Sequence, residues 1–116
     1  MNNLNSVILE GVIISCNYSE NSDFSVATLN VLFNRSFVDR NNQPITETST
    51  MKVLCYEKLA KSCHKNATPD RGIRIVGRLR QDKHKENDGR VTSEIVLIAE
   101  HIEFKPKTQK SEKKEN

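Results

Sequence analysis

The sequence has no tryptophan, and aromatic residues make up only 5% of its 116 residues. Hydrophobic residues are also few, at 35%, where globular domains usually have about 45–50%. Apolar runs are all far shorter than the roughly 20 residues that a membrane-crossing helix needs, so a membrane partner is not expected. This composition predicts one domain whose small core is surrounded by long polar segments.

Cysteine is scarce as well. The three cysteines, Cys16, Cys55 and Cys63, are odd in number and irregularly spaced, which argues against a secreted disulfide scaffold. The opening residues MNNLNSVILEGVII have neither the basic start nor the cleavage motif of a signal peptide. We therefore expect a reducing, cytoplasmic setting.

Recognisable catalytic and metal-binding motifs are missing. Cys55, Cys63 and His64 are the only soft ligands near one another, and their spacing matches no structural zinc pattern. We expect both thiols to lie in the core, because Cys55 falls on a predicted strand and Cys63 on the apolar side of a predicted helix. No nucleophile–base pair or phosphate-cradling glycine loop is evident, so we expect no metal, no other cofactor and no enzyme.

Positive charge is concentrated in one part of the chain, although the formal net charge is only +3. Residues 71–90, RGIRIVGRLRQDKHKENDGR, carry seven Lys or Arg and three acids, and residues 105–116 carry five Lys and two Glu. The remainder is therefore net negative. This segregation favours an anionic partner, although a basic strand can also be only the solvated face of a sheet.

Short β-branched runs between turn residues predict five strands. Their predicted ranges are 7–14, with a kink or bulge at Gly11, then 24–33, 50–56, 72–82 and 91–104. Residues 17–23 and 83–90 are predicted to be turns. Residues 34–49 form either a long polar loop or a hairpin whose arms extend beyond the core.

The only good helical segment is residues 57–65, where Leu59, Ala60 and Cys63 form one small apolar face. A short helix between the third and fourth of five strands is the arrangement of the OB-fold, an all-β Greek-key barrel. We therefore predict an OB barrel with extended hairpins over residues 1–106. The last residues, 107–116, are predicted to be a disordered basic tail.

Four stretches resemble the bacterial single-stranded DNA-binding proteins, in order and in spacing, across residues 3–104. They are NSVILEGVI, FSVATLNVLFNRSF, VLCYEKLAKSC and the basic stretch 71–90. The resemblance implies a non-enzymatic, nucleoid-associated protein that protects single-stranded DNA in replication, recombination and repair, usually as a homotetramer. Many members recruit partners through an acidic C-terminal peptide. This sequence ends in KSEKKEN, so that route of recruitment is not expected.

By position, the family's base-stacking rings correspond to Phe37, Thr50, Tyr56 and His84. Thr50 cannot stack, which weakens the expected wrapping of a strand. Packing remains open as an alternative for Phe37, a cap on the core for Tyr56, and simple exposure for His84. Phe24, Phe33 and Phe104 are expected in the core.

Single-strand binding needs cations for phosphates and flat faces for bases. We predict that Arg74, Arg78 and Arg80 form an outward-facing row on the fourth strand, because they alternate with apolar residues. The complete predicted binding set is Arg35, Phe37, Arg40, Lys52, Tyr56, Lys58, Arg71, Arg74, Arg78, Arg80, Lys83, His84 and Lys85.

Two other functions remain open at this point. One is a primosome accessory protein of the same fold, which would be a dimer and depend on protein contacts. The other is an OB adaptor that pairs with proteins through the edge of its barrel.

Overall fold

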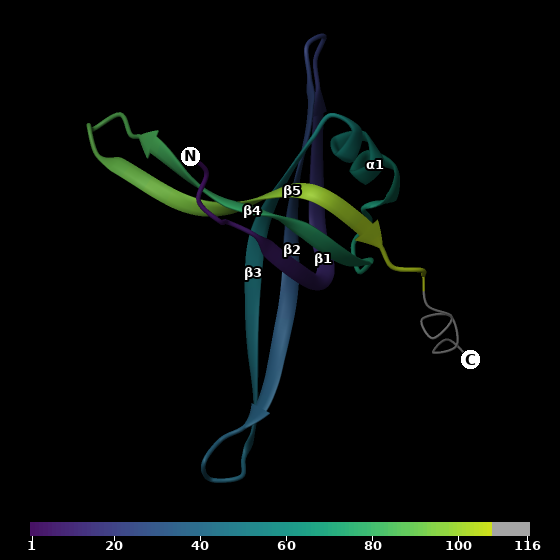
Figure 1. Ribbon diagram of the computed structural model, residues 1–116, viewed down its shortest axis with the longest axis vertical. Coiled ribbons are helices and arrows are strands. Elements are labelled where there is room, and N and C mark those ends of the chain that lie inside the picture. The colour runs from purple at the N-terminus through teal and green to yellow at the C-terminus, as the bar shows by residue number, and fades with distance from the viewer. Residues whose placement is uncertain (108–116) are drawn as a thin grey trace.

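The computed structural model describes residues 1–107, so the predicted tail lies, from residue 108 onward, outside the described residues. The elements are β1 (Val7–Glu20), β2 (Ser25–Val38), β3 (Pro44–Tyr56), α1 (Lys58–Asn66), β4 (Gly72–Lys85) and β5 (Val91–Phe104). The strands close into a barrel in the order β1-β2-β3-β5-β4 (Figure 1). The predicted OB barrel, with one helix between the third and fourth strands, is confirmed.

The β2–β3 hairpin extends well beyond the closed barrel (Figure 1). Its ladder runs without interruption from Val26 opposite Tyr56 to Val38 opposite Pro44. The hairpin alternative for residues 34–49 is therefore right, and the loop alternative is wrong. The segment is polar because both faces of the hairpin meet water beyond the barrel.

The two predicted turns begin too early, because the strands continue beyond the barrel with polar residues. Strand β1 continues to Glu20, and strand β4 continues to Lys85, so the actual turns are only residues 21–24 and 86–90. In the first turn, the side-chain oxygen of Asn21 accepts hydrogen bonds from the backbone N–H groups of Asp23 and Phe24, at 2.9 and 3.1 Å. The polar ends of β1 and β4 therefore resemble turns in the sequence, although they are strands.

The core fills the barrel with small and β-branched side chains from every strand, and α1 covers one end. The main buried residues are Ile13, Ala27, Leu29, Val31, Val53, Cys55, Ala60, Cys63, Ile73, Ile75, Leu97 and Ala99. The predicted burial of Cys55 and Cys63 is confirmed, with the two sulfur atoms 3.7 Å apart.

The phenylalanines only partly follow the prediction. Phe104 packs against the core, and Phe33 is half-buried outside it. Phe24 was expected in the core, but its side chain lies in the β1–β2 turn and the residue is 46% exposed. The inward alternation of β2 begins at the next residue, Ser25, which is only 3% exposed.

Helix α1 starts without a side-chain cap, because Glu57 at the N-cap position makes no capping hydrogen bond. Its first turn has no acidic residue, while Ala60 and Cys63 are buried against the barrel. In the described residues, no helix is long and apolar enough to cross a membrane.

Two glycines lie where strands approach too closely for a side chain. A methyl group on Gly11 would collide with the carbonyl oxygen of Leu32, and one on Gly77 with that of Ile98. Of the kink and the bulge predicted at Gly11, the bulge is wrong, because the register of β1 shifts between Ile13 and Ser15. Gly11 instead lies just before Val12, where β1 leaves β4 and begins to pair with β2.

Replacing Gly77 with alanine should lower the free energy of unfolding by about 2 kcal/mol or more, because the backbone of β5 must move to admit the methyl group. Gly72→Ala in the same strand is the matched control, since its methyl group would meet only the flexible Lys105 side chain, at 3.3 Å. Urea unfolding followed by circular dichroism measures both. Equal stability of the two variants would contradict the close crossing.

Candidate nucleic-acid interface

The outer faces of β3, β5 and β4 form one surface, which we call the β3–β5–β4 surface. Strand β5 lies between the other two, parallel to β3 and antiparallel to β4. Because side chains alternate along each strand, charged residues from all three strands reach the same side. The residues that meet at the centre of this surface are Lys52, Tyr56, Arg80, Asp82, His84 and Glu94, which we call the central cluster.

Two carboxylates hold the basic side chains of the central cluster in place. The Oε1 atom of Glu94 lies 3.2 Å from Lys52 Nζ and 3.3 Å from His84 Nε2. The Nε atom of Arg80 donates to Asp82 Oδ1 at 2.6 Å. Arg80 also donates from Nη2 to the Tyr56 hydroxyl at 3.4 Å. The contact with Arg80 holds Tyr56, which is half-buried, among the charged groups.

These contacts favour the ionised forms of Glu94, Asp82 and Arg80. The hydrogen bond from Lys52 is the main reason that the pKa of Glu94 lies below its usual value. The hydrogen bond from Arg80 likewise lowers the pKa of Asp82. In return, Asp82 and then Tyr56 raise the pKa of Arg80. The central cluster therefore contains ionised acids as well as cations.

The row of arginines on β4 faces outward as predicted, but it is not a row of free cations. Arg74 pairs with Glu10 on β1 and with Glu103 on β5, and Arg78 pairs with Glu100 at 3.4 Å. About half of each arginine side chain remains exposed. Charge that is segregated along the sequence is thus balanced in space by acids on neighbouring strands.

The other predicted residues are spread over several surfaces. On the β2–β3 hairpin, the guanidinium of Arg35 lies 5.0 Å from the centre of the half-buried Phe37 ring, and Arg40 is exposed in the turn. On β4, alternation places Lys83 and Lys85 on the opposite face from His84.

Lys58 and Arg71 lie near the two ends of the segment that connects β3 to β4. Lys58 is the first residue of the helix and is exposed. Arg71 donates from Nε to the carbonyl oxygen of Lys105 at 2.7 Å, and its guanidinium lies 5.5 Å from the centre of the Phe104 ring. These contacts tie the end of β5 to the start of β4.

Sequence reasoning missed the acids that shape this surface. Glu94 faces it because Asp82 and Glu94 are directly opposite in the β4–β5 ladder. Glu100 reaches Arg78 because the register shifts beside Gly77, which places an additional residue in β5. Neither pairing can be recognised without the register of the two strands.

Sequence comparison relates the chain to single-strand binding proteins. A family model described as "Single-strand binding protein family" matches residues 4–105. The "Single-stranded DNA-binding protein 2" of Chlorobaculum tepidum is 26% identical over 114 residues, which cover 96% of this chain and 77% of that protein.

Solved structures establish the likeness of the fold. The structure titled "Plasmodium falciparum SSB complex with ssDNA" superposes with a TM-score of 0.81 at 20% identity, over 91% of this chain and 98% of that one. A small single-stranded DNA-binding protein from Streptomyces coelicolor gives a TM-score of 0.72 at 14% identity, over 90% and 96% of the two chains.

Replacing Lys52 with alanine should raise the pKa of Glu94 toward its ordinary value, because the main hydrogen bond to the carboxylate is lost. In the native protein this pKa is depressed, so the pair stabilises the fold above pH about 4.5 and loses its effect as the pH falls through the depressed value. NMR titration of the Glu94 carboxyl carbon measures the shift. His84→Ala is the control and should change the pKa less; an unchanged pKa in Lys52→Ala would refute the contact.

Proposed function

Because this chain belongs to the single-strand binding protein family, we propose that it binds single-stranded DNA and protects it, without catalysis, in replication, recombination and repair. Its place in the cell would then be with the DNA, in the cytoplasm and nucleoid. The observation that carries the proposal is the central cluster, in which Arg80 contacts the hydroxyl of Tyr56 and Lys52 lies on the same barrel face. Cations for phosphates and a ring for bases are the two requirements of single-strand binding.

Phosphates would reach the arginines by replacing carboxylates. Ion pairs at an exposed surface contribute little net stability because water and salt screen them, so Arg74, Arg78 and Arg80 can exchange one anion for another. A phosphate also offers several acceptor oxygens to the planar guanidinium group. The released acids repel the strand, so we expect weaker binding than a row of unpaired arginines would give.

The β2–β3 hairpin would extend the binding surface. Arg35 already lies over one face of Phe37, and cation–π contact of this kind can hold a ring in position for a base. The exposed Arg40 at the turn adds a cation that makes no ion pair with other residues between 1 and 107.

Self-association would use the outer face of β1. Ile8, Val12 and Ile14 are 71%, 39% and 44% exposed, and β1 pairs with β2 only from Val12 onward. A second copy could cover these side chains and add hydrogen bonds along Val7–Gly11.

We propose a homotetramer, with a dimer as the alternative. Light scattering at micromolar concentration measures the molar mass, and a monomer would exclude both assemblies.

A protein adaptor is the second candidate function. It is favoured by the pairing of the β4 arginines with the protein's own acids and by the apolar residues on β1. In that case the barrel would bind a protein and show no affinity for a single strand.

Fluorescence anisotropy with a labelled thymidine oligonucleotide over a salt series tests the proposed function. We expect binding that weakens as salt increases, with a slope of log K against log salt of about −0.7 for each phosphate neutralised. No binding even at low salt would reject the proposal and leave the adaptor function.

Replacing Phe37 with alanine should lower the affinity for the thymidine strand by ~1–3 kcal/mol, because one stacking face is removed. The fold should survive, since Phe37 lies on the hairpin beyond the barrel. Phe24→Ala removes an exposed ring beside the opposite end of β2 and is the matched control. If both variants bind as the native protein does, Phe37 is not a stacking residue; if Phe37→Ala unfolds, the ring has a packing role.

A further inference from the structure

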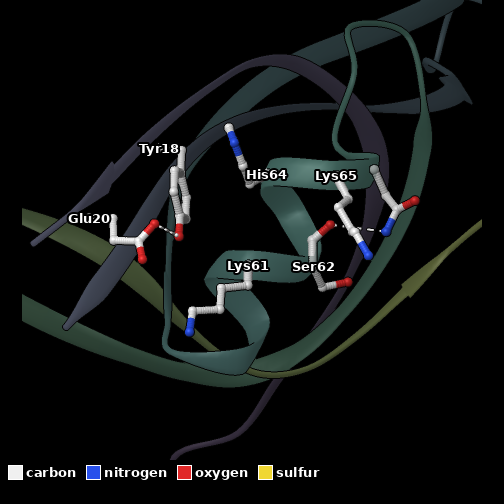
Figure 2. A pocket seen from close by; sticks show the side chains of 7 residues that line it. Tyr18, Glu20, Lys61, Ser62, His64 and Lys65 are labelled. Atoms are coloured by element: carbon white, nitrogen blue, oxygen red, sulfur yellow. Dashed lines mark hydrogen bonds between the residues drawn. The ribbon is translucent and has the colours of Figure 1, made fainter. Parts of the chain in front are cut away.

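A pocket of about 630 Å³ lies between the end of β1 and helix α1 and shares no residue with the central cluster. Its walls include Tyr18 and Glu20 from β1 and Lys61, His64, Lys65 and Asn66 from α1 (Figure 2). None of these residues belongs to the binding set predicted from the sequence. Two rings and two lysines are among the lining residues, so the pocket has the same two kinds of group that the proposed function requires.

The aromatic part of the pocket is preorganised. The rings of Tyr18 and His64 are stacked, with centroids 4.1 Å apart and planes 17° from parallel (Figure 2). The Tyr18 hydroxyl donates to Glu20 Oε1 at 2.9 Å, which fixes the direction of the phenol. Tyr18 is half-buried, whereas His64 is exposed, so a flat base can continue the stack on the outer side of the imidazole.

The cationic part of the pocket belongs to a stripe on α1. Lys58, Lys61 and Lys65 follow one another at intervals of three and four residues, so they lie along one face of the helix. Within residues 1–107, no carboxylate pairs with any of the three. The arginines of β4, in contrast, all have acidic partners.

The stability of the helix explains only the last lysine of this stripe, because Lys65 lies at the negative end of the helix dipole. Like charges at these spacings repel one another, and Lys58 stands at the positive end of the helix dipole. The helix has neither an acidic residue in its first turn nor a side-chain cap that would offset the repulsion. A bound polyanion would remove the repulsion.

We propose that this pocket and the lysine stripe bind a second segment of the same single strand. A base stacks on His64 and Tyr18, while the flanking phosphates pair with Lys61, Lys65 and then Lys58. The stripe spans about 10 Å at 1.5 Å per residue, which favours consecutive phosphates of a strand over a single mononucleotide. This assignment rests on the proposed function and adds to it a contact outside the β3–β5–β4 surface.

Tyrosine fluorescence provides a direct test. The sequence has two tyrosines and no tryptophan, so Tyr56→Phe leaves Tyr18 as the only strongly fluorescent side chain. We expect its emission to change when a long thymidine oligonucleotide saturates the protein, with saturation measured independently by anisotropy. Unchanged emission at saturation would overturn the inference. An equal change with thymidine monophosphate alone would overturn the assignment to a strand.

A charge variant tests the lysines. Lys61→Gln with Lys65→Gln should flatten the slope of log K against log salt by about 1.4, because two phosphate contacts are lost at about 0.7 each. The control, Lys105→Gln with Lys107→Gln, removes the same two charges elsewhere and should leave the slope nearly unchanged. An equal effect in both would show an effect of net charge and overturn the inference.

These results separate the two proposals. If the native protein binds no oligonucleotide, the proposed function itself fails. Suppose instead that the native protein binds, that the Tyr18 emission does not change at saturation, and that Lys61→Gln with Lys65→Gln has the same salt slope as its control variant. Only the second segment then fails. Should the charge variant not fold by circular dichroism, the Tyr18 emission alone decides the question.

Discussion

The shape of this protein depends on two places where backbones approach without room for a side chain. At Gly11, strand β1 changes its partner from β4 to β2, and at Gly77 strand β4 crosses close to β5. These close contacts let five strands of 13 or 14 residues close around a core of small aliphatic side chains. The strands are longer than the barrel needs, so their ends leave it as hairpins.

Charge is distributed in two different ways on this barrel. On the β3–β5–β4 surface, every arginine of β4 has a carboxylate beside it, and one glutamate serves both Lys52 and His84. On α1, the lysines face water without such partners among the residues described. On the β3–β5–β4 surface, a phosphate can replace a carboxylate at a small cost in free energy. On α1, the lysines attract anions without first having to release a carboxylate.

Sequence patterns predicted the order of the elements well, because β-branched runs and the helical spacing of Leu59, Ala60 and Cys63 depend on local periodicity. They were less successful at strand ends, where polar residues of a hairpin resemble a turn. They also placed Phe24 inside, because a shift of one residue reverses which face is buried.

The binding surface was harder to predict than the fold. The pattern on β4 correctly indicated that Arg74 and Arg78 face outward, but it contained no information on Glu10, Glu100 or Glu103. Those acids come from other strands and are brought together only by register and by a bulge. The stack of Tyr18 on His64 was missed because residue 18 was assigned to a turn. Neighbours of this kind are a property of the closed barrel and are not encoded within any single segment.

The outer half of the β2–β3 hairpin is mostly exposed on both faces from Asn34 through Thr50. Little besides the ladder between its two strands protects its amides, so these groups should be among the first to exchange hydrogen with solvent. A ligand lying along the hairpin would restrict the local opening that hydrogen exchange requires. Part of its binding free energy would then offset the conformational entropy that the hairpin loses. Slower amide exchange in this hairpin would then show that a ligand is bound, even if no group of the protein changes its ionisation.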